Sequence, residues 1–136
     1  MSWLLDTNVL SEMRKGFGAD ERVRVWAAGT AKDRHFISVL SLGEIRRGIE
    51  LLRKKSPSQC PAFERWLTQI QTDYASAILP VSEEVAERWG HLTAIRTLPV
   101  VDGLIAATAS VYGLTVVTRN TKDFAPSGVR TVNPLE

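Results

Sequence analysis

Short apolar runs alternate with amphipathic helical patterns from one end of this 136-residue chain to the other. Five runs have the length and the apolar content typical of strands, at residues 3–5, 35–39, 77–81, 114–118 and 129–132. Pro80 lies in the third run and has no backbone N–H for a ladder, which places that strand at an edge of the sheet. Strands separated by helices predict an α/β domain with a central, mostly parallel sheet.

Apolar residues recur at steps of three and four between these runs, which predicts flanking helices. The clearest amphipathic pattern covers residues 42–52, and further patterns cover 9–13, 23–27, 61–74, 85–95 and 100–112. Pro61 suits a first helical residue, Ser82 an N-cap and Gly113 a C-terminal cap. No repeat, low-complexity tract or linker divides the chain, so we expect one domain over residues 1–136.

Composition narrows the function classes. The 44% hydrophobic content excludes general disorder, and the net charge of +2 is too low for a polybasic binder. A lone cysteine, Cys60, excludes a disulfide framework and fits a reducing cytoplasm. His35 and His91 are the only histidines, which excludes a histidine-rich metal site. Since no leader pattern and no apolar run of about 18 residues occur, we expect a soluble, cytoplasmic protein without membrane contact.

Four carboxylates stand at strand-to-helix junctions or near the starts of helices: Asp6, Glu44, Asp102 and Asp123. Ligands of open α/β sheets bind beyond the carboxyl ends of the strands, so all four side chains can point into one cleft. Four carboxylates in one pocket need a counter-charge, and oxygen donors favour Mg²⁺ or Mn²⁺ over Zn²⁺. A metal held in this way can activate water and stabilise the leaving oxygen of a phosphodiester, without a histidine nucleophile.

Each acid also has an ordinary structural interpretation. Asp6 and Asp102 can cap the helices that follow them. Glu44 can lie on a solvated helix face, and Asp123 can belong to a polar turn. Asp102 is set apart by its apolar neighbours in the sequence, because a buried aspartate needs a partner. Only the combination of the four acids favours a catalytic site.

After Glu44, residues 46–55 contain five cations and only one acid, Glu50. The cations are Arg46, Arg47, Arg53, Lys54 and Lys55. This run of cations can form a solvated helix face or border a groove for a phosphate backbone. The four tryptophans are spread over different elements at mostly apolar positions. We interpret them as core or interface residues before a base-stacking platform.

Three segments together resemble one known family. They read LLDTNVLSEMRKG at residues 4–16, SVLSLGEIRRGIELL at 38–52 and LPVVDGLIAATASVYGLTVVTRNTKDF at 98–124, in the family's order. The chain is similar to PIN-domain ribonucleases over essentially its whole length, and more narrowly to the VapC/FitB-type toxins of bacterial type II toxin–antitoxin systems. The resemblance implies a PIN-like α/β domain with Mg²⁺- or Mn²⁺-dependent endoribonuclease activity. It also implies a homodimer and a small VapB/FitA-type antitoxin that blocks the site in a hetero-oligomer.

The resemblance assigns catalytic and metal-binding roles to the four carboxylates. Asp6 matches the aspartate of the family's DTN motif, Glu44 the glutamate of its central helix, and Asp102 the aspartate that opens the IAATA-type helix. For the fourth acid, relatives use either the position of Asn120 or the acid of the following DF, and we expect Asp123 to fill it. Supporting roles fall on Thr7, Asn8, Thr118 and Asn120, and we expect RNA contacts at Arg46, Arg47 and Arg119.

Two other functions are compatible with acids at strand ends. A receiver-like regulatory module binds Mg²⁺ and is phosphorylated on aspartate, although it has paired acids after the first strand and here Asp6 stands alone. A non-catalytic PIN domain binds RNA without metal, although Asp6, Glu44 and Asp102 are intact. The ribonuclease hypothesis instead predicts in-line attack by water, which leaves a 5′-phosphate and a 3′-hydroxyl.

Overall fold

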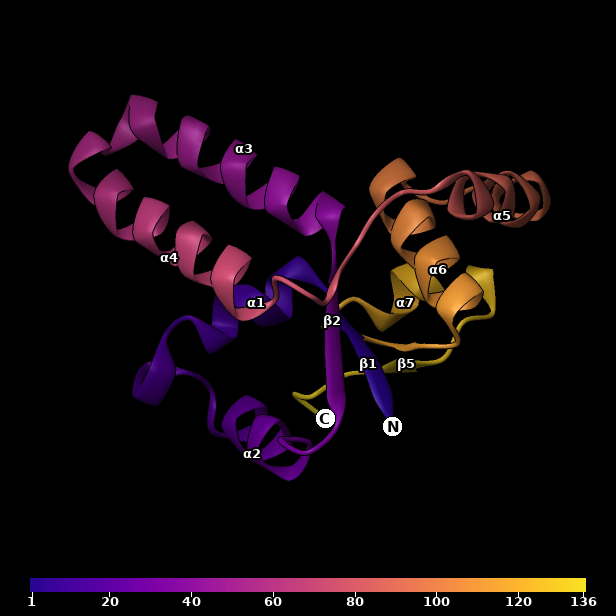
Figure 1. Cartoon of the computed structure of the whole chain (residues 1–136), viewed down its shortest axis with the longest axis horizontal. Helices are drawn as coiled ribbons and strands as arrows, with labels where there is room; N and C mark the ends of the chain where they lie inside the picture. The colour runs from indigo at the N-terminus through magenta and orange to yellow at the C-terminus, as the bar shows by residue number, and fades with distance from the viewer.

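The computed structural model describes residues 1–136 and places a five-stranded sheet at the centre of the domain (Figure 1). The strands stand in the order β3–β2–β1–β4–β5, and every neighbouring pair is parallel. Their bounds are β1 Ser2–Leu5, β2 Arg34–Ser38, β3 Ile78–Leu79, β4 Thr115–Val117 and β5 Thr131–Val132. The predicted α/β fold with a parallel sheet is confirmed, and β3, which precedes Pro80, forms an edge as predicted.

Seven α-helices and three 3₁₀ turns connect the strands. The helices are α1 Thr7–Met13, α2 Glu21–Gly29, α3 Val39–Lys55, α4 Cys60–Asp73, α5 Glu83–Ile95, α6 Val100–Tyr112 and α7 Thr121–Phe124, and the turns are η1 Gly16–Gly18, η2 Pro57–Gln59 and η3 Ala125–Ser127. In Figure 1, α3 and α4 form a long hairpin on one side of the sheet, and α5 and α6 lie on the other. No single helix is long and apolar enough to cross a membrane, and α5 and α6 reach that length only as a pair bent by 118°.

The residues at the helix ends explain most of the boundaries. Ser38 caps α3 with its side chain, so β2 ends at that residue, one position earlier than predicted. Ser82 caps α5 as predicted. Gly113 ends α6 with φ +66°, in the left-handed region that glycine adopts without steric cost. Helix α4 begins at Cys60, so Pro61 is its second residue rather than its first.

Two short elements differ from the sequence expectations. Helix α7 has four residues, too few to show a helical period, and was not predicted. Strand β3 has two residues instead of five. It pairs with β2 only through Ile37–Ile78 and Ser38–Leu79, and it ends before Pro80.

The core lies on both faces of the sheet because side chains alternate along β1. Leu4 packs on one face with residues of α6, β4 and α7, whereas Leu5 packs on the other with residues of α1, β2 and α4. The first cluster also holds Ile105, Ala106, Ala109, Leu114, Val116 and Phe124, and the second holds Trp3, Val9, Leu10, Ile37, Ile70 and Val117. The small, fully buried alanines of α6 let that helix pack closely on the sheet, as predicted.

The α3–α4 hairpin has a small core of its own and an ionic network on its surface. The core consists of Ile45, Ile49, Cys60 and Leu67. Glu64 of α4 accepts hydrogen bonds from Arg46 and Arg53 of α3 at 2.9 Å, and both arginines also pair with Glu50. The cation run that was noted along this helix is therefore partly neutralised within the hairpin.

Candidate active site

Asp6 is buried at the junction of β1 and α1. Its Oδ1 accepts the Thr7 N–H at 2.8 Å, so the residue is the N-cap of α1, as its structural interpretation predicted. Its Oδ2 accepts the hydroxyl of Thr118, at the end of β4, at 2.8 Å. Burial raises the pKa of Asp6 above its ordinary value, although these hydrogen bonds oppose the shift. The carboxylate is thus fixed at the carboxyl end of the central strand.

Asn8 links the ends of the two neighbouring strands β1 and β4. Its Nδ2 lies 3.3 Å from both Asp6 Oδ2 and Thr118 Oγ1, and its Oδ1 accepts the Arg119 N–H at 3.2 Å. Asn120 donates its backbone N–H to Thr118 Oγ1 at 3.0 Å. Asn8 and Thr118 therefore bond directly to Asp6, whereas Asn120 acts only through Thr118.

Glu44 reaches the site from the second turn of α3. The Thr7 hydroxyl donates to Glu44 Oε1 at 2.7 Å and lies 2.9 Å from the Ser41 hydroxyl, which ties α1 to α3. Ser41 is fully buried, and sequence reasoning did not include it among the site residues. The signal that identifies it is its spacing, because a residue three positions before Glu44 lies on the same helix face.

Asp102 lies in the first turn of α6, partly exposed and without a hydrogen bond from its side chain. Burial, and after it the negative charges of Asp6, Asp123 and Glu44 in that order, together raise the pKa of Asp102 from 3.8 to about 6. Three like charges act on one carboxyl group, so the four acids that the sequence singled out share one electrostatic environment. We call these four residues the acid cluster.

Asp123 brings the α7 element into the acid cluster. Its charge raises the pKa of both Asp6 and Asp102. Its backbone N–H donates to the carbonyl of Asn120 at 3.0 Å, and the side chain of Asn120 makes no capping bond to α7. As the side chains stand, no three of the chain's His, Cys, Asp and Glu residues lie close enough to hold one metal ion. The four acids thus affect one another's charge, but their carboxylates do not lie close enough to share one ion.

The three arginines considered for RNA contacts differ in their surroundings. Arg119 lowers the pKa of Asp6 through its positive charge, which places its side chain at the border of the acid cluster. Arg46 is held in the hairpin by a bidentate pair with Glu64. Arg47 is exposed and forms no ion pair. Only Arg119 therefore acts on the acid cluster directly.

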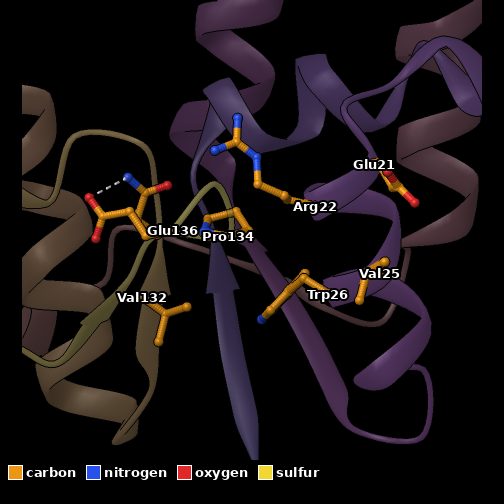
Figure 2. Close-up of a pocket in the computed structure, with 8 residues that line it drawn as sticks. Glu21, Arg22, Val25, Trp26, Val132, Pro134 and Glu136 are labelled. Atoms are coloured by element: carbon orange, nitrogen blue, oxygen red, sulfur yellow. Dashed lines mark hydrogen bonds between the residues drawn. The ribbon is translucent and has the colours of Figure 1, made fainter.

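A cavity of about 420 Å³ lies away from the acid cluster, between α2 and the C-terminal segment. Figure 2 shows Arg22 and Trp26 of α2 on one wall, and Val132 and Pro134 on the other. Arg22 is already paired with Asp20 at 3.0 Å, and none of the four acids lines this cavity. The chemistry of the acid cluster, not cavity size, locates the candidate site.

A parallel sheet with the buried Asp6 at the carboxyl end of its central strand, coupled to three further acids, defines an α/β domain with an acidic site. Its strand order differs from the β2–β1–β3–β4–β5 order of receiver-type, flavodoxin-like sheets. The structure therefore excludes the receiver-like alternative.

The chain belongs to the PIN domain family, whose model matches residues 3–125. It is 34% identical to Toxin FitB of Neisseria gonorrhoeae over 136 residues, which is 96% of each chain. It is 28% identical to VapC ribonuclease Y4jK of Sinorhizobium fredii, over 98% of this chain and 97% of that one. Among solved structures, FitAcB from Neisseria gonorrhoeae superimposes with a TM-score of 0.88 at 32% identity, over 98% of this chain and 99% of that one. The family expected from the sequence motifs is confirmed.

Proposed function

We propose that this chain is the toxin of a type II toxin–antitoxin pair and that it cleaves RNA at internal phosphodiester bonds with Mg²⁺ or Mn²⁺. The observation that carries the proposal is the buried Asp6 carboxylate, fixed by Thr7, Asn8 and Thr118 at the end of the central strand. The charges of Asp6, Asp123 and Glu44 add to burial in raising the pKa of Asp102 to about 6. Such a cluster is unfavourable unless a cation offsets its charge, and perturbed acids of this kind mark functional sites. The similarity to Toxin FitB and VapC ribonuclease Y4jK supports the toxin and RNA parts.

The donor set fits a hard divalent cation because all four side chains offer carboxylate oxygens. Asp6, Asp102 and Asp123 would hold the ion, with Glu44 binding it directly or through water. When bound, the ion supplies a Lewis acid that makes a coordinated water more acidic and offsets the charge of the leaving 3′ oxygen. The exposed Asp123 and the partly exposed Asp102 have room to turn toward Asp6.

Residues of this chain fix the acid cluster in advance. Three donors hold Asp6: the Thr7 N–H, the Asn8 amide and the Thr118 hydroxyl. The Thr7 hydroxyl orients Glu44 in the same way. Arg119 adds a positive charge beside Asp6, which suits a phosphate group of the substrate. The rigid half of the cluster is therefore on α1 and α3, and the adjustable half is on α6 and α7.

The proposal includes the partners. Similar solved structures include FitAB bound to an IR36 DNA fragment, with a TM-score of 0.83 at 33% identity over 98% of this chain and 96% of that one. A toxin–antitoxin complex from Klebsiella pneumoniae is 28% identical, with a TM-score of 0.67 over 96% of each chain. For this chain we infer a homodimer that acts in the cytoplasm. We also infer a cognate FitA/VapB-type antitoxin that inhibits the acid cluster within a hetero-oligomer.

The direct test is RNA cleavage by the purified chain with Mg²⁺ or Mn²⁺, and with EDTA. We expect cleavage only with metal, and products that carry a 5′-phosphate and a 3′-hydroxyl. Asp6→Asn and Asp102→Asn should each lower the rate by at least about 100-fold, because each removes a charge that holds the ion. Glu87→Gln is the matched control, since Glu87 is exposed on α5 and forms no ion pair.

Several outcomes contradict the proposal. Equal rates for wild type and both aspartate variants would remove the acid cluster from the chemistry. A 2′,3′-cyclic phosphate among the products would contradict attack by water. RNA binding without metal and without cleavage would favour the non-catalytic PIN domain instead.

A further inference from the structure

A pocket of about 290 Å³ begins at the acid cluster and extends between α1 and the α3–α4 hairpin. Thr7 and Glu44 line it, and both belong to the hydrogen-bonded site described above. Gly48 of α3 lines its side, and Phe63 and Trp66 of α4 form its aromatic wall. The pocket thus shares Glu44 with the acid cluster and adjoins it there.

We propose that this pocket receives a nucleobase of the RNA, next to the phosphodiester that is cleaved. The proposal rests on the ribonuclease function proposed above and assigns a place to one base of that substrate. It makes the aromatic wall and Gly48 determinants of substrate recognition.

The size and chemistry of the pocket suit a single base. A base has two apolar faces and a polar edge, and aromatic side chains are the usual platform for such faces in single-stranded RNA. Phe63 and Trp66 are half-buried and stand edge to face, with ring centres 6.3 Å apart at 78°. At the polar rim, Ser11 Oγ has no protein hydrogen-bond partner. The aromatic wall can therefore take the base's apolar surface, and the rim can meet its edge.

Charge favours RNA over an apolar protein segment as the occupant. The guanidinium of Arg14 lies 4.3 Å from the ring centre of Phe63 and 5.8 Å from that of Trp66, and it forms no ion pair. Trp66 also lines an adjoining pocket that includes Arg14, so this cation borders the base pocket. A cation beside aromatic rings suits the alternating phosphates and bases of a single strand. An apolar helix would bring no charge to Arg14.

Gly48 allows the pocket to be filled without damage to the fold. It lies inside α3, and a Cβ built on it meets no atom within 4 Å. Gly48→Leu therefore places a side chain in the pocket and replaces a poor helix former with a good one. Gly90→Leu is the matched control, because Gly90 lies within α5, away from the pocket, and a Cβ there also meets nothing within 4 Å.

The experiment uses a fluorescent RNA of about ten nucleotides that the wild type cleaves at one bond, with copies that lack one base at each position in turn. We measure kcat/KM with Mn²⁺, and affinity by fluorescence anisotropy in EDTA. For the wild type, loss of one base beside the cleaved bond should lower kcat/KM and affinity about tenfold. Gly48→Leu should lose about tenfold on the intact RNA and become indifferent to that base, whereas Gly90→Leu should match the wild type.

The design separates this inference from the proposed activity. If no RNA is cleaved, anisotropy with one RNA of about ten nucleotides and its copies that each lack one base still measures the base-dependent affinity and its loss in Gly48→Leu. Unchanged RNA affinity and kcat/KM in Gly48→Leu would overturn the inference, and so would an equal effect of base removal at every position. Weakened antitoxin binding alone, with RNA unaffected, would assign the pocket to the antitoxin and overturn it too. Phe63→Leu, which shortens the aromatic wall, is the second variant should Gly48→Leu fail to fold.

Discussion

Single residues in this site hold elements of the fold together and also belong to the proposed metal site. The sequence offered helix capping and catalysis as alternative roles for Asp6, and the structure shows that its two carboxylate oxygens are used separately. Oδ1 accepts the first N–H of α1, and Oδ2 accepts the hydroxyl of Thr118. The stability of the protein is therefore sensitive to changes at Asp6 and its donors.

Thr118→Val tests the bond to Asp6 in a nearly isosteric way. Thr118 is fully buried, so the variant leaves a buried carboxylate short of one donor and removes an acceptor from Asn8 and Asn120. We expect a loss of about 1–2 kcal/mol in the free energy of unfolding, measured by urea titration. Thr118→Ser keeps the hydroxyl, so its free energy of unfolding should stay close to that of the wild type. Equal stability of wild type and Thr118→Val would show that the bond contributes nothing.

The raised pKa of Asp102 predicts a pH-dependent stability of the metal-free protein. Because the pKa rises from 3.8 in the unfolded chain to about 6 in the folded one, folding favours the protonated acid. The favourable contribution of Asp102 to the free energy of unfolding is thus fully present below pH 3.8 and is lost as the pH rises through about 6. Asp102→Asn removes this penalty. We expect it to stabilise the protein in EDTA by about 1 kcal/mol near pH 8, a value reduced for partial exposure, and by almost nothing near pH 4.

Urea midpoints at these two pH values check the expectation. Glu87→Gln, which removes an acid from an exposed position of α5, should show no such pH-dependent gain. If Asp102→Asn gained the same stability at both pH values, the gain could not come from removing a buried and repelled charge.

At the scale of helices and strands, end residues fix the elements that position the site. Gly113 closes α6, the helix that carries Asp102, with φ +66°. We expect Gly113→Ala to lower the free energy of unfolding by about 1 kcal/mol, because alanine is strained in the left-handed region. Gly29→Ala at the end of α2 is the matched control, since Gly29 has no positive φ and open space around a Cβ. A neutral Gly113→Ala would show that the helix end adjusts at no cost.

The same elements show how much the sequence determined. The long helix α3 and the buried strand β4 have strong periodic or apolar patterns, and their existence was predicted. Helix α7 was missed because four residues cannot display a period, yet this helix carries Asp123. The four acids were found because strand ends mark the cleft of a parallel sheet. Ser41 was missed although its spacing places it on the helix face of Glu44, because spacing alone does not show its contact with Thr7, 34 positions away.

For the whole molecule, the small net charge conceals a segregated distribution. With four of the 15 acids in the acid cluster, 17 lysines and arginines face 11 acids over the rest of the chain. The metal-free protein therefore carries a local excess of negative charge on a moderately basic body. Under the proposed function, the phosphates of an RNA would meet attraction from the body and, without a bound cation, repulsion from the acid cluster.

This distribution predicts that Mg²⁺ stabilises the whole domain. An ion that binds only the folded chain at about 100 times its Kd adds roughly 2.7 kcal/mol, which raises Tm by on the order of 10 °C. Differential scanning calorimetry with Mg²⁺ or EDTA checks the shift, with NaCl at matched ionic strength as control. Asp102→Asn should show a smaller shift than the wild type. An equal shift in NaCl would mean general screening in place of a bound ion.

The unequal anchoring of the acids has a practical consequence for trapping an uncut RNA complex. Asp6 holds the start of α1 and the end of β4, so replacing it disturbs the scaffold along with the proposed metal site. Asp102 accepts no hydrogen bond and stands on the first turn of a helix that Gly113 and a buried alanine face already secure. If the chain cleaves RNA as proposed, a variant at Asp102 should therefore keep the fold but not cleave, which makes it the better choice for crystallisation with RNA.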